Sequence, residues 1–210
     1  MDGVIIDSEP VYFEIDKQMF EELNIAVSFE EHCSYVGTSS QNMWETIINK
    51  HGITNQRDEL MKKEYSLYKK YLADANNLQP IDGVIELIND LHQSNFKLIL
   101  ASSSRMETIE IILNKFNLSG LFIDKISGSE LAHSKPHPEI FWKAAQLTRS
   151  EPRDCIVIED SKNGVTAAKA AGMKCIGFLN PNSGDQNLAH ADLVIRSFRE
   201  LDPTIIKSFY

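Results

Sequence analysis

Residues 154–173 read DCIVIEDSKNGVTAAKAAGM, and this stretch decides the fold. It begins with a short apolar run, which is typical of a strand buried on both faces of a parallel sheet. An alanine-rich helix is expected from about Asn163, and Gly172 is a suitable left-handed residue to end it. Glu159 and Asp160 stand between the strand and the helix. The stretch is therefore a strand–turn–helix unit with two carboxylates at the turn.

Similar units fill the chain from residue 81 onward. Further apolar runs occur at residues 96–101 (FKLILA), 175–179 (CIGFL) and 193–195 (LVI). Between them, apolar residues recur at helical spacing in two groups: Val84, Leu87, Ile88 and Leu91, then Ile109, Ile112, Leu113 and Phe116. Alternating strands and helices predict an α/β fold with a doubly wound parallel sheet.

Residues 11–77 have a different pattern. Their apolar residues share helix faces, and no β-like run interrupts them; the three stripes are Ile15, Met19 and Leu23, then Trp44, Ile47 and Ile48, then Met61, Tyr65, Tyr68 and Leu72. Residues 79–83 form a turn-rich return linker. We therefore expect a core domain of residues 1–9 and 81–210, with residues 10–80 inserted as an all-helical cap domain.

Composition limits the classes of partner. A formal charge of −9 disfavours nucleic acid and anionic membranes, which both favour clustered Lys and Arg. No apolar run approaches the roughly 18 residues of a membrane span. Cys33, Cys155 and Cys175 are widely spaced, with no CxxC pair, and we expect a reduced, cytoplasmic setting. A reactive thiol is the alternative, but no His or helix start flanks these cysteines suggestively.

Ligands of doubly wound sheets bind beyond the carboxyl ends of the strands, so the polar residues there are candidate site residues. Ser102 and Ser103 follow the first long run and can form a phosphate cradle at a helix start, or simply cap that helix. Lys135 lies in a proline-containing loop, either as a point charge for phosphate or as a solvated residue. Glu159 and Asp160 are an oxygen pair suited to Mg²⁺.

Simpler structural alternatives exist for the remaining polar positions. Asp160 or Ser161 could merely cap the following helix. Asp2 with Gly3 could be only a turn. The stretch 7–10 (DSEP) could equally be a helix start, with proline in the first turn.

Taken in chain order, the motifs are more specific than any one of them. DGVIIDSEP (2–10), LASSS (100–104), KPHPE (135–139) and IEDSKNGVTAAKAAGM (158–173) resemble the haloacid dehalogenase (HAD) superfamily, and the helical insertion resembles the cap of its β-phosphoglucomutase-like branch. The resemblance implies a HAD-like core and phosphoryl transfer through an aspartyl phosphate. It places the nucleophilic aspartate, and the strand that leads to it, before Met1. If that aspartate is absent, the alternative is a non-catalytic binding relative.

The resemblance also implies roles for the motif residues. Asp2 is the expected acid/base and offers its backbone carbonyl to Mg²⁺, with Glu159 and Asp160 as the other metal ligands. The transferring phosphoryl group is expected to be held by Ser102, Ser103 and Lys135. Asp7, Tyr12, Gly37 and Arg105 are the expected substrate-binding residues. The resemblance suggests a monomer.

Three cap positions separate two possible activities. At three equivalent positions the mutase of this branch has His, Arg and Lys, whereas this chain has Tyr12, Ser40 and Glu64. Each lost charged hydrogen bond is worth about 1.5–3 kcal/mol, which should weaken a site for a doubly phosphorylated sugar. We therefore expect a Mg²⁺-dependent phosphatase acting on a small phosphorylated metabolite such as a sugar phosphate. The alternative is β-phosphoglucomutase, which a distal phosphate contact from Arg105 would favour.

Overall fold

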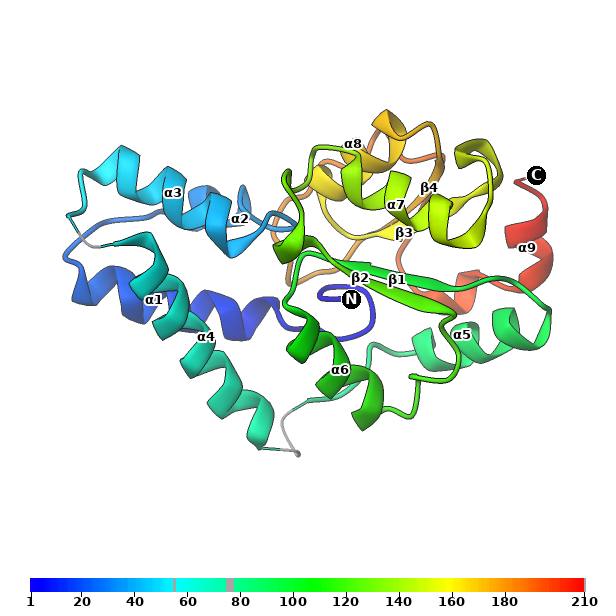
Figure 1. The fold of residues 1–210 in the computed structure, drawn as a ribbon, viewed down its shortest axis with the longest axis horizontal. Helices are drawn as coiled ribbons and strands as arrows, with labels where there is room; N and C mark the ends of the chain where they lie inside the picture. Colours follow the sequence, from blue (N-terminus) through cyan, green and yellow to red (C-terminus); the bar gives the residue numbers. More distant parts are fainter. Residues whose placement is uncertain (55, 75–77, 210) are drawn as a thin grey trace.

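Parallel strands joined by helices form the larger part of the molecule (Figure 1). The computed structural model describes residues 1–54, 56–74 and 78–209. In this part of the chain there are two parallel ladders: β1 (Ile99–Ser102) with β2 (Asp124–Ser127), and β3 (Ile156–Glu159) with β4 (Lys174–Phe178) and β5 (Leu193–Ile195). Four of these strands match the predicted apolar runs. β2 was not predicted, because its sequence DKIS contains a single apolar residue.

Helices cover both sides of the strands, as a doubly wound fold requires. α5 (Val84–Gln93) and α6 (Met106–Lys115) lie below the strands in Figure 1, and α7 (Glu139–Thr148) and α8 (Lys162–Ala170) lie above them. Short elements complete the core: η1 (Gly128–Glu130), η2 (Pro152–Asp154), η3 (Phe198–Glu200) and α9 (Pro203–Lys207). Gly172 has φ 80°, so a left-handed glycine follows α8 as predicted. The α/β class is confirmed.

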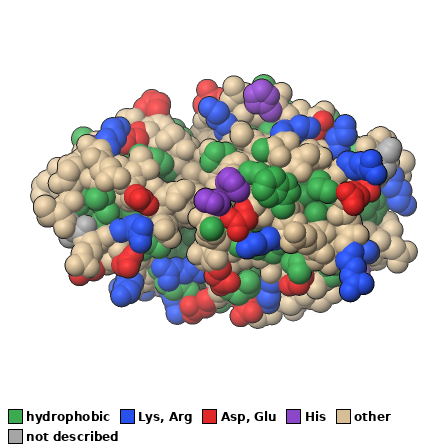
Figure 2. All heavy atoms as spheres, turned by 45° about the horizontal axis from the view of Figure 1, so that its top comes forward, with side chains coloured by type: hydrophobic (Ala, Val, Ile, Leu, Met, Phe, Trp, Pro, Cys, Tyr) green, Lys and Arg blue, Asp and Glu red, His purple; other side chains and the backbone are tan. Residues whose placement is uncertain are grey.

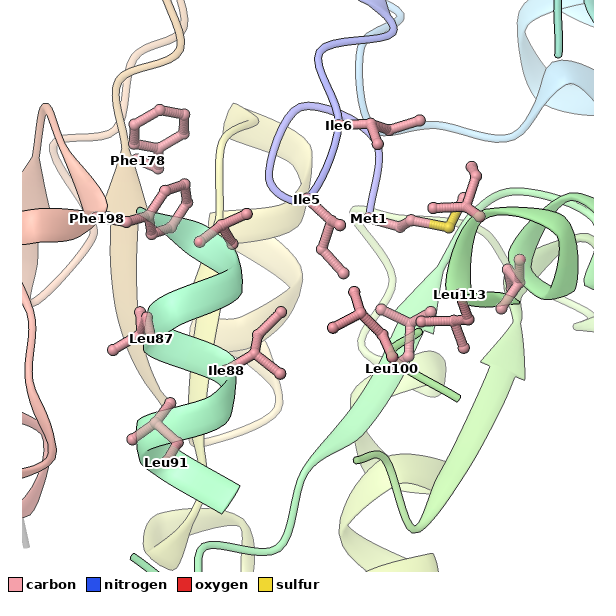
Figure 3. Close-up of a cluster of buried hydrophobic side chains, with 14 of the residues drawn as sticks. Met1, Ile5, Ile6, Leu87, Ile88, Leu91, Leu100, Leu113, Phe178 and Phe198 are labelled. Atoms are coloured by element: carbon pink, nitrogen blue, oxygen red, sulfur yellow. The ribbon is translucent and has the colours of Figure 1, made fainter. Parts of the chain in front are cut away.

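A large cavity separates the two ladders inside the core. The surrounding apolar cluster includes Ile5, Ile88, Leu100 and Phe198 (Figure 3). Residues of β1 and β3, with Met1 and α5, line the cavity, whose volume is about 560 Å³. Among the described residues, β1 and β3 have no ladder partner on this side. The strand that we expect before Met1 would fit between these two edges, and its presence stays a prediction.

The inserted cap consists of α1 (Glu9–Glu22), α2 (Phe29–Cys33), α3 (Ser40–His51) and α4 (Arg57–Ala73). Its own apolar cluster is centred on Trp44 and Ile47, both fully buried, so two of the predicted stripes pack as expected. No strand occurs in the cap among residues 10–54 and 56–74. The two chain segments that join cap and core lie side by side, because Ile81 N donates to Ile5 O at 2.9 Å. The domain boundaries at residues 9/10 and 80/81 stay a prediction.

The surface carries both signs of charge. Figure 2 shows acidic and basic side chains interspersed over the face that it displays. None of the described helices is both long enough and apolar enough to span a bilayer.

Filling the cavity between β1 and β3 should stabilise the core. We expect an N-terminal extension placed directly before Met1 to raise the free energy of unfolding. The extension consists of five apolar, β-branched residues followed by Phe-Asp. Cavity formation of even one side chain costs about 2–5 kcal/mol, so the gain should be several kcal/mol. Urea denaturation of the extended and unextended chains measures it. A Gly/Ser extension of equal length is the control, and equal stability of both extended chains would contradict the prediction.

Candidate active site

Polar side chains from the ends of the strands meet at the interface between core and cap. They line a cavity of about 150 Å³. The core side of the cavity includes Asp2, Ser102, Ser103, Ser104, Arg105, Lys135, Glu159 and Asp160. The cap side includes Glu9, Tyr12, Asp16, His32, Gly37, Ser40, Glu64, Tyr65 and Tyr68. Parallel strands end at the same edge, which is why residues so distant in sequence converge.

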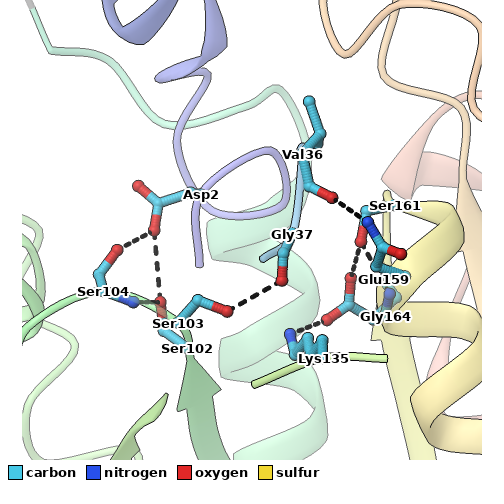
Figure 4. Close-up of polar contacts among 11 residues, drawn as sticks. Asp2, Val36, Gly37, Ser102, Ser103, Ser104, Lys135, Glu159, Ser161 and Gly164 are labelled. Carbon is cyan, nitrogen blue, oxygen red and sulfur yellow. Dashed lines mark hydrogen bonds and ion pairs between the residues drawn. The ribbon is translucent and has the colours of Figure 1, made fainter. Parts of the chain in front are cut away.

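Asp2 is held by three hydroxyl groups. Its Oδ1 accepts a hydrogen bond from Ser8 Oγ at 2.9 Å (Figure 4 shows the contacts of the other oxygen). Its Oδ2 accepts from Ser104 Oγ at 2.6 Å and from Ser102 Oγ at 3.3 Å. Residues 7–10 do form a helix start, because Ser8 is the N-cap residue of α1 and Pro10 lies in its first turn, but the Ser8 side chain makes no capping bond. Its hydroxyl orients Asp2 instead.

The serine cluster also joins the core to the cap. Ser103 Oγ donates to Gly37 O at 3.0 Å. Gly37 has φ +79°, and a Cβ there would lie 2.2 Å from Ser161 Oγ, so only glycine lets this loop approach. Asn163 Nδ2 donates to Val36 O at 2.9 Å on the same loop. The predicted residues Ser103 and Gly37 therefore meet at the cap–core contact.

Lys135 and Glu159 form a buried ion pair (Figure 4). Lys135 is 5% exposed and Glu159 is 6% exposed, so the alternative of a solvated loop lysine is wrong. Glu159 also accepts a hydrogen bond from Ser161 Oγ at 3.2 Å. Burial by itself raises the pKa of the Glu159 carboxyl, but the Lys135 ammonium outweighs burial and holds that pKa below its ordinary value.

Asp160 is a buried carboxylate that does not cap α8. Ser161 is the N-cap residue, and its Oγ accepts from Gly164 N at 2.9 Å, so the capping alternative is confirmed for Ser161 and wrong for Asp160. Asp160 Oδ2 accepts from Ser183 Oγ at 2.7 Å. Burial, reinforced by the charge of Glu159, raises the pKa of Asp160 to about 7. Among the described residues, no Lys, Arg or His side chain donates a hydrogen bond to this carboxylate.

A cation such as Mg²⁺ would need oxygen ligands at this edge of the core. Within the described residues, no three His, Cys, Asp or Glu side chains gather closely enough to hold a metal by themselves. Mg²⁺ does not need such a cage, since it keeps several waters and uses one or two carboxylates with substrate phosphate. Gly3 lies directly against Asp160, where a Cβ would come 2.0 Å from Oδ2. Asp160 and the adjacent backbone therefore fit a cation, while Glu159 is engaged by Lys135.

Three other predicted substrate residues have different surroundings. Tyr12 lines the cavity and stacks on Tyr68 with ring centroids 4.3 Å apart. Arg105 also lines it, with its guanidinium 4.5 Å from the centre of the Tyr65 ring. Asp7 lies outside the cavity, and its carboxylate accepts hydrogen bonds from the side-chain amides of Asn180 and Asn182. The structure thus brings Tyr12 and Arg105 to the site and leaves Asp7 beside it.

Two groups of site residues were missed from the sequence. Asn180 and Ser183 follow β4, and they contact Gly3 O (3.2 Å) and Asp160. The rule applied to the other strand ends would have found them, because they are the polar residues after the run 175–179. Asp16 on the cap side was also missed. The sequence signal for Asp16 is that it lies one helical turn after Tyr12, on a helix face whose other residues point inward.

Glu64 is a second buried carboxyl of the cap. Its Oε1 accepts from Ser40 Oγ at 3.0 Å and its Oε2 from Trp44 Nε1 at 2.9 Å. Burial, with the nearby charge of Asp16, raises the pKa of Glu64 to about 8. Ser40 and Glu64, two of the three cap positions on which the phosphatase expectation was based, are thus paired with each other.

Comparisons with known proteins identify the family of the chain. The family model described as haloacid dehalogenase-like hydrolase matches residues 1–178. A probable pseudouridine-5'-phosphatase of Drosophila melanogaster is 28% identical over 97% of this chain and 89% of its own length. The β-phosphoglucomutase of Bacillus subtilis is 31% identical over 96% of this chain and 88% of its own length. The crystal structure of β-phosphoglucomutase from Clostridium difficile superposes with a TM-score of 0.86 at 25% identity, covering 100% of this chain and 93% of that one.

The fold and the polar edge define an α/β enzyme with a helical cap over its strand ends. The chain belongs to the haloacid dehalogenase-like hydrolases, in the β-phosphoglucomutase-like branch, and is a phosphatase or phosphomutase of the HAD type. The resemblance stated from the motifs is confirmed.

Ionisation of Glu64 should reduce stability at high pH. Because its pKa is raised from 4.5 to about 8, the folded state favours the protonated form, and its stabilising effect is lost as pH rises from 4.5 toward 8. At about 1.4 kcal/mol per pKa unit, the loss is a few kcal/mol. Glu64→Gln should shrink the difference in unfolding free energy between pH 5 and pH 8.5, measured by urea denaturation. Glu21→Gln, at an exposed position of α1, is the control. An unchanged difference in Glu64→Gln would count against the assignment.

Proposed function

We propose that this protein is a Mg²⁺-dependent phosphatase that hydrolyses a small sugar phosphate through an aspartyl phosphate. The observation that carries the proposal is the convergence of Asp2, Ser102, Lys135 and Asp160 on one small cavity under the cap. A cytoplasmic location and a monomeric state belong to the same proposal. The three cysteines, all free of disulfides, support a reducing compartment.

In the proposed first step, the aspartate expected immediately before Met1 attacks the phosphorus atom and the bond to the ester oxygen breaks. Asp2 gives a proton to that oxygen, so the alcohol leaves neutral. Three hydroxyl donors fix the orientation of Asp2 for this transfer. In the second step, Asp2 takes a proton from a water molecule that attacks the phosphorus, the bond between phosphorus and the aspartate oxygen breaks, and inorganic phosphate and the free aspartate carboxylate result.

The phosphoryl group is held by the polar edge of the core. Ser102 offers a hydroxyl, Ser103 an amide, and Lys135 a fixed positive charge at the end of its buried ion pair. Asp160 and the backbone carbonyl of Asp2 are the proposed direct Mg²⁺ ligands, and Glu159, which pairs with Lys135, would contribute through water. The metal would supply neutralisation of the phosphate charge. Gly37 and Ser103 join the cap to this edge, so closure of the cap would exclude water.

The cap side of the cavity supports hydrolysis over phosphoryl return to sugar. A mutase must hold a second phosphate, which needs cations beyond those at the reacting centre. Here Ser40 and Glu64 hydrogen-bond to each other at 3.0 Å. Among the described lining residues of the cap, His32 is the one basic residue, and there is no Lys or Arg.

β-Phosphoglucomutase is the second candidate activity. Arg105 lines the cavity from the core side and could reach a distal phosphate. The similarity to the B. subtilis mutase supports the same candidate. The two activities differ in what accepts the phosphoryl group: water or sugar.

The fate of β-glucose 1-phosphate separates these activities. We expect release of inorganic phosphate to be faster than formation of glucose 6-phosphate, because the cap lacks the cations that would retain a bisphosphate. Both products are measured in one reaction with Mg²⁺, using a colorimetric phosphate assay and a coupled dehydrogenase assay. Faster formation of glucose 6-phosphate would establish the mutase instead.

Asp160→Asn should abolish Mg²⁺-dependent turnover and leave the fold intact. The amide keeps the shape and can retain the contact with Ser183, but it removes the charge that favours the cation. We expect a loss of at least about 100-fold in kcat/KM, comparable with the loss of one strong electrostatic contact to the transition state. Turnover is measured with a panel of sugar phosphates, using protein that carries the aspartate expected before Met1, and the melting temperature is measured on the same samples.

Asp202→Asn is the matched control, because it makes the same chemical change at the N-cap of α9, remote from the cavity. Its turnover should equal that of the unmodified protein. Retained activity in Asp160→Asn would remove the metal assignment.

A further inference from the structure

Asp16 presents a buried acceptor atom to the cavity. It lies in the middle of α1, is 2% exposed, and its Oδ2 contacts His32 Nε2 at 2.8 Å. Its Oδ1 is buried and has no hydrogen-bond partner among the described residues. An unpaired buried acceptor costs about 1–3 kcal/mol, so a partner for Oδ1 is expected when the site is filled.

Asp16 lies where a group inside the cavity can reach it. Asp16 and His32 both line the cavity that also contains Asp2 and Lys135. His32 is fixed by edge contacts with the rings of Phe13 and Phe20, at 5.2 and 6.4 Å between centroids. The pair is therefore held rigidly with one carboxylate oxygen left for a group inside the cavity.

The cap side of the cavity has further polar groups and, among its described lining residues, no Lys or Arg. Tyr68 is 1% exposed, and its hydroxyl also lacks a partner of good geometry among the described residues. Burial raises the pKa of Glu64 to about 8, so its carboxyl is largely neutral at pH 7. Asp16 is paired with His32 through Oδ2 alone. Such a wall suits hydroxyl groups, and it lacks the lysine or arginine side chains that a second phosphate needs.

The size of the cavity restricts the ligand further. At about 150 Å³ it is smaller than the usual clefts for drug-sized ligands, which are roughly 300–1,000 Å³. A cavity of this size favours a small leaving group over a bulky one such as a nucleoside.

We propose that Asp16 is a specificity-determining residue, whose Oδ1 accepts a hydrogen bond from a hydroxyl of the leaving group. The subsite of Asp16, His32 and Tyr68 selects an uncharged polyhydroxyl leaving group, as in a hexose or hexitol monophosphate. It disfavours a second phosphate. This inference rests on the proposed phosphatase function of the same cavity.

The Asp16→Asn variant tests the inference. An amide keeps the shape and a contact with His32, but turns a donor or a poorer acceptor toward the cavity. Binding of glucose 6-phosphate and sorbitol 6-phosphate is measured by calorimetry, with inorganic phosphate as the reference ligand. We expect Kd for both sugar phosphates to rise at least tenfold and Kd for inorganic phosphate to stay within twofold. Glu14→Gln, an exposed carboxyl of the same helix, should change neither.

Turnover separates this inference from the function on which it rests. The leaving group of p-nitrophenyl phosphate has no aliphatic hydroxyl, so Asp16→Asn should lower kcat/KM for sorbitol 6-phosphate at least tenfold more than kcat/KM for p-nitrophenyl phosphate. If the unmodified protein hydrolyses p-nitrophenyl phosphate but Asp16→Asn lowers both substrates equally, Asp16 is only structural and the inference is overturned. If the unmodified protein hydrolyses neither substrate, the proposed function fails.

Two further ligands test the charge preference. Glucose 1,6-bisphosphate should bind the unmodified protein at least tenfold more weakly than glucose 6-phosphate. Tighter binding of the bisphosphate, or at least tenfold tighter binding of glucosamine 6-phosphate than of glucose 6-phosphate, would show that the subsite takes a charged group and would overturn the inference.

Discussion

The buried ion pair of Lys135 and Glu159 is the interaction on which the site depends. Glu159 ends β3 in one parallel ladder, and Lys135 lies in the loop that follows β2 in the other ladder. The pair therefore fixes the polar edges of both ladders relative to each other. Removing one partner would leave a buried charge uncompensated, which costs about 3–5 kcal/mol. Asp160 stands beside this pair and hydrogen-bonds to Ser183, and burial together with the charge of Glu159 raises its pKa to about 7.

The cap wall of the cavity differs from the core wall in its charged groups. It holds carboxyl groups and hydroxyls, and burial raises the pKa of Glu9 and Glu64 well above the ordinary range for a carboxyl. The core wall holds Lys135 and Arg105, together with the carboxyl groups of Asp2, Glu159 and Asp160. A substrate that carries phosphate at one end and hydroxyls at the other matches this placement of the Lys and Arg side chains on the core wall. The direct contacts of Gly37 with Ser103 and of Val36 with Asn163 make the position of the cap part of the site.

Much of the core could be predicted because it depends on local patterns. The apolar runs gave β1, β3, β4 and β5, and the spacing of Val84, Leu87 and Leu91 gave α5. β2 escaped, since a strand with one apolar residue has no periodic signal and is defined only by pairing with β1. The lack of a local sequence signal also made the environment of Lys135 impossible to predict. Its burial arises from Glu159, 24 residues away in sequence, and no local pattern reports that distance.

The sequence by itself determined the α/β class, the helical insertion and the chemistry of the strand ends, because periodicity and strand–helix order are encoded in neighbouring residues. Only the tertiary structure decided how the carboxylates divide their roles. Ser161 caps α8, Glu159 pairs with Lys135, Asp160 is left to Ser183, and Asp7 turns away from the cavity. These outcomes depend on burial and on contacts between distant segments, which set the pKa and the partner of each group. The same holds for Asp16, whose free oxygen exists only because α1 packs against His32 of α2.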